Sequence, residues 1–431
     1  MICENIGVSG GTLLFAGQST IELAREYGTP LYLMDEDRIR HNCRVYTAAF
    51  RKYFSPRSLP YYASKACSFT DIYRIMREEG MGADLVSAGE IATARRAGFD
   101  LGRACFHGNN KTDAEIRYAM DSRVGCFVVD CEEELLRIDA TAAELGMRQR
   151  VLLRLTPGID PHTYEAISTG KVDSKFGSAI ETGQAERITL LALSLRNIEL
   201  AGFHCHVGSQ VFRENVFERA AAVMIAFMAR MRDEHGYLAR ELDLGGGYGV
   251  RYAEADGSVD IAAKIGEVAK AVYGECARLG VEPPDVFMEP GRSIVADAGM
   301  TLYTVGSVKR IPDYKNYVSV DGGMTDNPRY ALYGARCTCH IANRMDERAE
   351  LHCSLVGRCC ESGDIIQPDI FLPESVRRGD IAAVCTTGAY NYSMASNYNR
   401  VPRPPVVLLR GGESRVAVRR ESLDDLSAND V

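Results

Sequence analysis

The feature that most constrains the fold of this chain is a regular alternation of apolar and amphipathic segments between residues 59 and 292. Eight apolar runs have the length and composition of buried strands: Leu59–Ser64, Ala83–Ser87, Ala104–His107, Gly125–Val129, Arg150–Leu155, Glu199–Val207, Glu241–Leu244 and Asp285–Met288. Helical stretches separate them, among them Ile91–Ala97, Asp113–Met120, Glu132–Leu145, Val216–Glu234 and Ile261–Leu279. Eight strands alternating with helices over roughly 230 residues predict a (β/α)8 TIM barrel. A doubly wound open sheet is the competing arrangement.

The alternation stops after Arg292, and strand-like runs separated by turns follow it. These runs are Thr301–Ser307, Tyr317–Val320, Ala331–Tyr333, Leu351–Val356, Ile381–Cys385, Pro405–Leu409 and Arg415–Val418. They predict a mainly β second domain. Another strand-like run, Gly11–Gly17, precedes the alternation, and we expect it to join that domain. The predicted division is an N-terminal segment over residues 1–28, a barrel over residues 29–292 and a mainly β domain over residues 293–431.

The composition is that of a globular enzyme-sized protein. With 431 residues, 46% of them hydrophobic and 25% charged, the chain is long enough for two domains. Its net charge of −8 argues against nucleic acid or a membrane surface as a partner. No apolar run approaches the roughly 18 residues of a membrane span, and the start, Met1 to Glu4, lacks the features of a signal peptide. We therefore expect a cytoplasmic protein.

The cysteines raise the question of a metal site. The chain has 14 of them, scattered through apolar runs as reduced core thiols usually are. Cys337-Thr338-Cys339-His340, with His352 and Cys353 downstream, is the arrangement that invites a metal interpretation. Its spacing fits neither zinc nor haem attachment patterns, so we expect no metal there.

Polar residues and glycines follow the predicted strands at their carboxyl ends. They are Lys65, Ser87 with Gly89 and Glu90, His107 to Asn110, Arg154, His204 to Ser209, Gly245 to Gly247, and Glu289 to Arg292. Barrel enzymes keep their active sites at this face, whereas random placement would scatter such residues over both ends. The pattern predicts an enzyme.

Lys65 stands directly after the first of these strands. A lysine is rarely buried without a task, because loss of its hydration is costly. A neutral lysine in a dry site is a nucleophile that forms a Schiff base with a carbonyl group. A surface lysine at a strand end is the alternative, and this segment alone does not decide between the two.

The other strand ends favour a phosphorylated aromatic cofactor. Gly245 to Gly247 leave backbone N–H groups open to an anion, and Ser209 and Arg292 would add a hydroxyl and a charge, although tight turns use the same glycines. His206 is either a hydrogen-bonded core residue or a ring that stacks on the cofactor. Glu289 would pair with a ring nitrogen. Together with a lysine, these are the needs of pyridoxal 5'-phosphate (PLP) used as an electron sink.

Four motifs carry a resemblance to a known family. Tyr62–Ala66, His204–Gln210, Asp243–Gly247 and Glu289–Arg292 resemble the alanine-racemase-like, fold type III family of PLP-dependent decarboxylases. Four further stretches narrow the resemblance to the diaminopimelate decarboxylases within that family: Gly170–Gly177, Asp321–Arg329, Cys360–Asp364 and Gly388–Ala395. The likeness runs from about Gly28 to Pro405 in the family's order.

The resemblance implies PLP bound to Lys65 in the barrel. It implies that His206 stacks on the ring, that Glu289 partners the pyridine nitrogen, and that Ser209 and Gly245, Gly246 and Gly247 hold the phosphate. Arg292 and Tyr390 would lie beside both the cofactor and the substrate.

The resemblance also implies a substrate site and a homodimer with shared active sites. Arg292, Arg329 and Tyr333 would bind substrate carboxylates. Cys360 and Glu361 would reach the site from the other subunit, with Glu361 holding the distal ammonium. Either Cys360 or Lys65 would return a proton to the carbanion. Without the surrounding motif, Cys360 is better interpreted as another buried thiol than as a catalytic residue.

The implied reaction is decarboxylation of meso-2,6-diaminopimelate, a diamino dicarboxylic acid, to L-lysine and CO2. Two separated arginines fit a dicarboxylate better than ornithine, and ornithine-type members are expected to carry aspartate in place of Glu361. The alternatives are a decarboxylase of carboxynorspermidine, ornithine or arginine, a racemase, or a non-catalytic PLP-binding barrel. The last would be expected to lose Lys65, Cys360 or Glu361, all of which are present. Cys67 and Tyr330 depart from the family pattern beside key positions.

Overall fold

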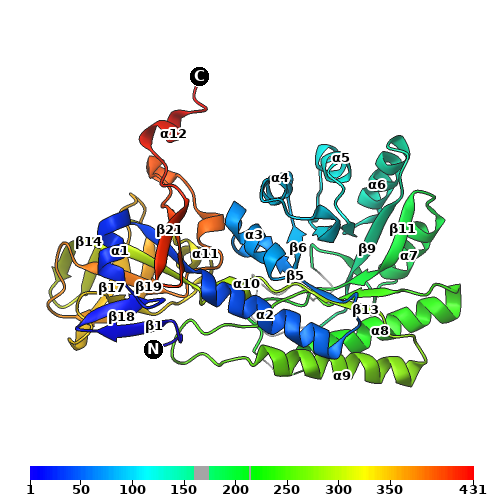
Figure 1. Cartoon of the computed structure of the whole chain (residues 1–431), viewed down its shortest axis with the longest axis horizontal. Helices are drawn as coiled ribbons and strands as arrows, with labels where there is room; N and C mark the ends of the chain where they lie inside the picture. The colour runs from blue at the N-terminus through cyan, green and yellow to red at the C-terminus, as the bar shows by residue number, and fades with distance from the viewer. Residues whose placement is uncertain (160–173, 213–214) are drawn as a thin grey trace. The chain divides into compact units, whose positions relative to one another are not determined.

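The computed structural model describes residues 1–159, 174–212 and 215–431, and Figure 1 gives its element labels. The chain forms two compact units. The β unit comprises Met1–His41, Val250–Gly257 and Ile294–Val431, and the barrel unit comprises Asn42–Gly249 and Ser258–Ser293. Within the described ranges, no helix has both the length and the apolar character needed to cross a lipid bilayer.

Eight parallel strands of the described chain form the barrel. They are β5 (Leu59–Ala63), β6 (Gly82–Leu85), β7 (Ala104–Phe106), β8 (Cys126–Val129), β9 (Gln149–Thr156), β11 (Ile198–His204), β12 (Glu241–Asp243) and β13 (Asp285–Met288). The sheet closes because β13 pairs with β5, Phe287 opposite Leu59, while β8 pairs with β9. Closure confirms the predicted barrel over the open sheet. The two-residue strand β10 (Ser178–Ala179) adds to β9.

Helices connect successive barrel strands, as the alternation predicts. They are α3 (Thr70–Glu78), α4 (Ala88–Arg96), α5 (Asp113–Asp121), α6 (Glu132–Glu144), α7 (Gln184–Ser194), α8 (Val216–His235) and α9 (Ile261–Leu279). Local signals fix their ends: Thr112 and Glu115 make a capping box at the start of α5, and Gly280 ends α9 in the left-handed conformation. The long helices α8 and α9 lie side by side (Figure 1).

The barrel interior is filled by side chains. Tyr61 and Phe287 stack with ring centroids 5.3 Å apart, and Cys105, Cys126 and Leu152 pack into the same buried cluster. Gly82 makes room for this packing, because a Cβ there would lie 2.1 Å from the Tyr61 ring. The interior is therefore a packed core, and chemistry is left to the strand ends.

A second sheet organises the β unit. Its order is β18 (Ile365–Pro373), β17 (Ala349–Val356), β15 (Lys315–Val320), β14 (Gly299–Ile311), β4 (Leu31–Asp35), β20 (Val406–Arg410) and β21 (Glu413–Val418). Strand β19 (Ile381–Cys385) pairs with β14, and β16 (Cys339–Ile341) pairs with β19. The short helices α10 (Arg292–Val295), α11 (Arg329–Tyr333) and α12 (Leu423–Ser427) lie in the C-terminal part of the chain.

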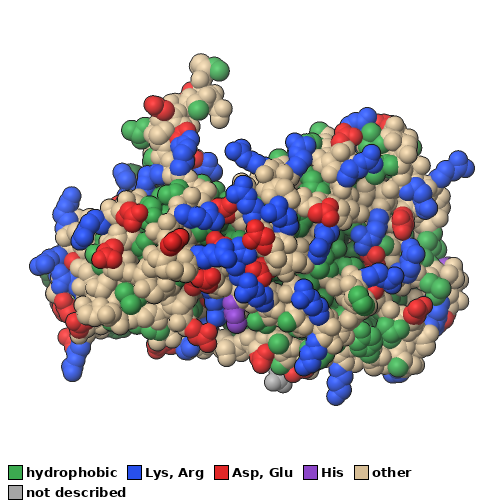
Figure 2. Space-filling model, in the orientation of Figure 1, with side chains coloured by type: hydrophobic (Ala, Val, Ile, Leu, Met, Phe, Trp, Pro, Cys, Tyr) green, Lys and Arg blue, Asp and Glu red, His purple; other side chains and the backbone are tan. Residues whose placement is uncertain are grey.

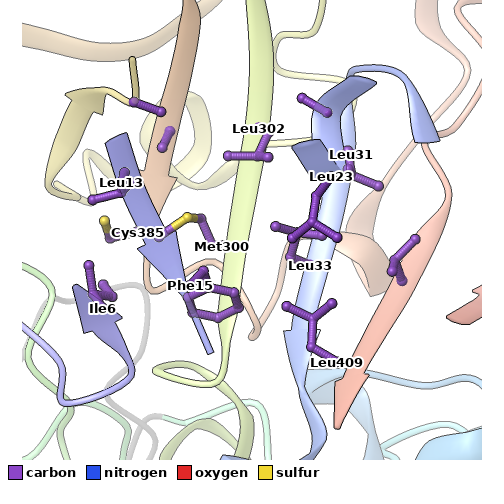
Figure 3. Packing of buried hydrophobic residues seen from close by; sticks show 14 of the residues in the cluster. Ile6, Leu13, Phe15, Leu23, Leu31, Leu33, Met300, Leu302, Cys385 and Leu409 are labelled. Atoms are coloured by element: carbon purple, nitrogen blue, oxygen red, sulfur yellow. The ribbon is translucent and has the colours of Figure 1, made fainter. Parts of the chain in front are cut away.

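The N-terminal segment packs on this sheet. Strands β1 (Ile6–Ser9), β2 (Thr12–Phe15) and β3 (Gln18–Ser19) form a small antiparallel sheet of their own, followed by α1 (Thr20–Tyr27). Figure 3 shows Leu13 and Phe15 of β2 beside Met300 and Leu302 of β14 in one buried cluster. The backbone N–H of Leu13 also donates to the carbonyl of Ala342.

Two details differ from the sequence expectation. The prediction of a strand at Ala331–Tyr333 is wrong. These residues belong to α11, which begins after Pro328 and is ended by Gly334 with φ 63°.

The predicted domain boundaries stay predictions. Strand β4 falls inside the predicted barrel range of residues 29–292, but it pairs with β14 and β20 of the β unit. Helix α2 (Glu36–Tyr53) then leads into the barrel unit.

Candidate active site

Lys65 lies at the carboxyl end of β5, as predicted. It is the middle residue of a single 3-10 turn, Ser64–Ala66, whose other two residues are buried while the Lys65 side chain is exposed. Its positive charge adds to the lowering of the His206 pKa and offsets part of the rise that burial causes in the pKa values of Asp84 and Glu90, which places Lys65 among the polar strand-end residues. A lysine at this position is accessible to a carbonyl ligand.

The glycines after β12 form a turn that has no room for side chains. A Cβ on Gly246 would lie 1.9 Å from the carbonyl oxygen of Glu289, and one on Gly247 would lie 2.0 Å from that of Gly208. Gly245 and Gly247 also have φ of 67° and 127°, conformations that favour glycine. The backbone here can approach an anion closely, as a phosphate site requires.

Ser209 and Arg292 supply polar side chains to the same group of loops. The Arg292 guanidinium donates to Ser209 Oγ from Nε at 3.3 Å and from Nη2 at 3.1 Å. Arg292 is buried and opens α10. A hydroxyl, a guanidinium and a glycine turn fit a phosphate group chemically.

His206 is held by the same turn. Its Nδ1 accepts a hydrogen bond from the N–H of Gly246 at 3.2 Å. Desolvation lowers the pKa of His206 well below its usual value, and the charge of Lys65 lowers it further. The ring is therefore neutral near pH 7 and is fixed in orientation, which suits a flat stacking surface.

Glu289 follows β13 and is buried between two imidazoles. Its Oε1 lies 2.7 Å from His107 Nε2, and its Oε2 lies 3.2 Å from His204 Nε2. Burial alone would raise the pKa of Glu289, but the two histidines outweigh burial and hold it well below its usual value. The carboxylate is thus ionised, as a partner for a protonated ring nitrogen must be.

In the β unit, Asp364 joins the two loops that carry the other predicted site residues. Its Oδ1 accepts the N–H of Met324 at 2.6 Å, and its Oδ2 accepts that of Cys359 at 2.7 Å. The carboxylate therefore fixes the loop that leads to Arg329 against the loop that contains Cys360.

Asp326 anchors the first of these loops. It is buried, accepts a short hydrogen bond from Tyr303 Oη, and accepts the N–H of Gly323 at 3.0 Å. Tyr32 Oη donates to its backbone carbonyl at 2.5 Å. Burial raises the pKa of Asp326 to about 7.

Arg329 is a buried guanidinium at the start of α11. It packs over the ring of Tyr252 at 4.1 Å from the centroid. Its Nη1 is buried without a hydrogen-bond partner in the described part of the chain. A buried donor without a partner is energetically costly, and a substrate carboxylate would supply the acceptor that Nη1 lacks. Tyr333, at the other end of α11, is 39% exposed.

Cys360, Glu361 and Tyr390 lie in loops of the β unit. The Cys360 and Glu361 side chains are exposed, and the Cys360 N–H donates to Asn399 Oδ1 at 2.8 Å. Tyr390 is only partly buried and has φ 59°, which is uncommon for a residue with a bulky side chain and is concentrated at functional sites.

The structure thus brings Lys65, His206, Ser209, Gly245 to Gly247, Glu289 and Arg292 to one end of the barrel unit, whereas Arg329, Tyr333, Cys360, Glu361 and Tyr390 belong to the β unit. The roles predicted for them stay predictions. The first four residues of the motif Gly170–Gly177, Gly170 to Asp173, lie outside the described residues.

Sequence reasoning gave no role to four residues that either contact site side chains or hold the loops that carry them. These are His107, His204, Tyr252 and Asp364. The usable signal for His107 and His204 was a titratable ring directly at the end of an apolar strand. Tyr252 and Asp364 lie in loops whose contacts depend on the tertiary fold.

Comparisons with known proteins identify the family to which this chain is similar. Residues 36–296 match the family model described as "Pyridoxal-dependent decarboxylase, pyridoxal binding domain". The chain is 44% identical to a diaminopimelate decarboxylase of Bacillus subtilis (strain 168) over 98% of this chain and 95% of the relative. It is 42% identical to one of Staphylococcus aureus (strain COL), with 98% of each chain covered. The crystal structure of diaminopimelate decarboxylase from M. jannaschii in complex with L-lysine superposes with a TM-score of 0.91 at 33% identity, over 99% of this chain and 98% of that one.

Proposed function

The chain belongs to the diaminopimelate decarboxylase family of PLP-dependent decarboxylases, and from this premise we propose that it converts meso-2,6-diaminopimelate to L-lysine and CO2. It is a carboxy-lyase with PLP as its cofactor. The observation that carries the choice of substrate is Arg329, whose buried Nη1 has no hydrogen-bond partner in the described residues. The distal carboxylate of diaminopimelate would satisfy it, whereas ornithine has no such group.

The barrel residues fit the cofactor. Lys65 would bond to its carbonyl carbon, His206 would cover one ring face, and Glu289 would hold the pyridine nitrogen protonated. The phosphate would be bound by the turn Gly245 to Gly247 and by the Ser209–Arg292 pair. The turn has no room for a Cβ, so its backbone N–H groups can approach the phosphate closely. When bound, PLP supplies an electron sink for the negative charge that develops at the substrate's α-carbon as CO2 leaves.

The β unit supplies the substrate groups. Arg329 would bind a carboxylate, with Tyr333 as a further hydroxyl donor, and Glu361 would accept from the distal ammonium. Cys360 would donate its Sγ proton to the α-carbon after loss of CO2. The exposure of Cys360 and Glu361 in the single chain supports the proposal that they complete the site of a second subunit in a cytoplasmic homodimer.

The reaction is tested by product analysis. Purified protein with PLP is mixed separately with meso-diaminopimelate, L-ornithine, L-arginine and carboxynorspermidine, and products are identified by mass spectrometry. We expect L-lysine and CO2 from meso-diaminopimelate and no product from the other three. Diamine formation from ornithine would contradict the substrate assignment, and no product from any compound would favour a non-catalytic PLP-binding barrel.

Shared active sites are tested by mixing inactive variants. Lys65→Ala and Cys360→Ala proteins are dissociated, mixed in equal amounts and reassociated. Random pairing leaves one native site in half of the dimers, so activity should return to about one quarter of wild type. Lys65→Ala mixed with His206→Ala is the control, because both changes fall in the barrel unit and no native site can form. Sites built within one chain would give no recovery in the first mixture.

A further inference from the structure

Behind the site, the barrel unit contains a group of buried titratable side chains that the proposed reaction does not by itself explain. His107 and His204 are both buried, and their rings pack edge to face with centroids 5.0 Å apart. His204 Nε2 is hydrogen-bonded to Glu289 Oε2 at 3.2 Å, whereas His107 Nε2 lies 2.7 Å from Oε1, at ion-pair distance but without hydrogen-bond geometry. The three residues come from the ends of β7, β11 and β13, so only the closed barrel brings them together.

The two imidazoles differ in their surroundings. Burial lowers the pKa of His204 to about 4, so His204 is neutral near pH 7 and contacts Glu289 as an N–H donor. Its Nδ1 is buried without a hydrogen-bond partner among the residues that the structure describes. His107 instead faces a second carboxylate, since Asp84 Oδ1 lies 3.8 Å from the same Nε2 that contacts Glu289.

Other charged groups face Glu289 from neighbouring strands. Asp243 is buried at the end of β12, where burial and the charge of Glu289 raise its pKa well above the usual value, and its Oδ1 accepts the N–H of Gly245 at 2.8 Å. Arg154 of β9 packs over the ring of Phe176, and desolvation lowers its pKa by more than Asp130, Glu289 and Asp84 raise it. The carboxylate therefore sits among acids as well as cations, and direct contacts decide its state.

A carboxylate has about four acceptor positions, two on each oxygen. His204 Nε2 occupies a position on Oε2, and His107 Nε2 lies 2.7 Å from Oε1, at ion-pair distance but without hydrogen-bond geometry. The two rings therefore flank the Glu289 group and restrict its orientation. Burial without these contacts would favour the protonated, neutral acid. A neutral Glu289 cannot hold a proton on a pyridine nitrogen.

We propose that His107 and His204 are positioning residues that fix the orientation and the negative charge of Glu289, and that the protonated state of the cofactor's ring nitrogen depends on both. The proposal rests on the proposed function for the identity of the cofactor. His107 Nε2 lies near both Glu289 and Asp84, whereas His204 donates a neutral N–H to Glu289. The two therefore respond differently to substitution.

The test compares His107→Leu, His107→Gln, His204→Leu and His204→Gln, each loaded with PLP labelled with 15N in its ring. The readout is the 15N chemical shift of the ring nitrogen between about pH 6 and pH 9, measured without substrate. In wild type the nitrogen should stay protonated throughout. In both leucine variants and in His107→Gln, we expect the pKa of the ring nitrogen to fall by about one unit or more, so that the nitrogen loses its proton within this pH range. His204→Gln keeps a neutral N–H donor and should behave as wild type.

Kinetics and a double-mutant cycle separate positioning from general damage. With the family's substrate, the leucine variants should lose about 10- to 100-fold in kcat with little change in KM. In a Glu289→Gln background, His107→Leu should add less than about threefold, because both changes remove the same interaction. His235→Leu is the matched control: its Nε2 lies 3.0 Å from Glu186 Oε1 on the surface of the same unit, and its loss should change neither readout.

A ring nitrogen that stays protonated in His107→Gln and His107→Leu would overturn the proposal, as would losses that multiply fully in the Glu289→Gln background. If a leucine variant does not fold, His107→Gln alone decides. Because the 15N readout needs no substrate, it is independent of the reaction. Failure to form lysine would overturn the proposed function while leaving this inference to its own result.

Discussion

Two buried carboxyl groups, Glu289 in the barrel unit and Asp326 in the β unit, show opposite responses to the same burial. Glu289 is 6% exposed and Asp326 is 1% exposed, yet the pKa of Glu289 lies well below its usual value and that of Asp326 is raised to about 7. Removal from water penalises the charged form of both, so burial does not account for the difference.

The partners account for it. Glu289 contacts two imidazole nitrogens, whereas Asp326 contacts the neutral hydroxyl of Tyr303 and the backbone N–H of Gly323. The neutral donors around Asp326 offset only part of the desolvation penalty, whereas the two imidazoles beside Glu289 more than offset it. One carboxyl is therefore suited to act as a charge and the other to act as a structural hydrogen-bonding group.

Exchanging each acid for its amide gives the largest expected contrast. Glu289→Gln removes the charge that we propose to lie opposite the ring nitrogen, and we expect kcat to fall by about 1,000-fold. Asp326→Asn keeps the hydrogen-bonding shape, and we expect a change of less than about tenfold. Steady-state kinetics with meso-diaminopimelate measure both. Equal losses would break the distinction between a functional charge and a structural one.

In the proposed site, the β unit would contribute a charge through Arg329 rather than through Asp326. Arg329→Gln should raise KM by about 100-fold, because one charge-assisted pair to the substrate carboxylate is lost, and cofactor binding should not change. Arg310→Gln serves as the control, since Arg310 pairs with Glu374 at 2.7 Å on the exposed surface of the same unit. An unchanged KM for Arg329→Gln would remove the support for a dicarboxylate substrate.

The neutral network around Asp326 has a geometric role that a small side chain can test. A Cβ on Gly323 would lie 2.5 Å from Asp364 Oδ1, so Gly323→Ala must displace the loop that leads to Arg329. We expect about a tenfold rise in KM and unchanged PLP affinity by fluorescence titration. Gly306→Ala is the matched change, because its nearest neighbour, the carbonyl of Ser319, would be at 3.7 Å. Loss of PLP affinity in Gly323→Ala would show that the loop acts on the barrel end.

The smallest effect is a pH dependence of stability with opposite signs for the two acids. The raised pKa of Asp326 contributes stability that is complete below its unfolded value of about 4 and is lost as pH rises through about 7. As the pH rises from about 5 to about 8, the free energy of unfolding of Asp326→Asn should therefore increase by about 1 to 3 kcal/mol relative to that of wild type.

The lowered pKa of Glu289 contributes stability that is present above its unfolded value of about 4 and is lost as pH falls below it. The Tm of Glu289→Gln should therefore lie below that of wild type at neutral pH and approach it only at acidic pH. Calorimetric scans of both variants from about pH 3 to pH 8 measure the two slopes. Slopes of the same sign would contradict the assignment of charge states.

The sequence predicts much of this molecule because its strongest signals are local. Eight apolar runs and their helices predicted the closed barrel, and contiguous motifs marked Lys65, His206 and Glu289. The two imidazoles on Glu289 come from other strands, and the register that directs them at one carboxylate follows from closure rather than from spacing.

Short segments were the second feature that the sequence could not assign. Ala331–Tyr333 has the same apolar pattern whether it is a strand or a helical turn, and Pro328 with Gly334 decided for the helix. The mixed surface carried no further signal: Figure 2 shows acidic and basic side chains interspersed over the visible face. Strand β4 falls inside the predicted barrel range of residues 29–292, and only its pairing with β14 and β20 assigns it to the β unit.

Neutron diffraction from a deuterated crystal at about pH 6 tests the comparison most directly, because it locates the protons on both carboxyl groups. At that pH, below the pKa of about 7 for Asp326, we expect a deuteron on or shared with the Asp326 carboxyl, none on Glu289, and one on Nε2 of His204 directed at Glu289. A deuteron on the Glu289 carboxyl, with bare imidazole nitrogens facing it, would contradict the account.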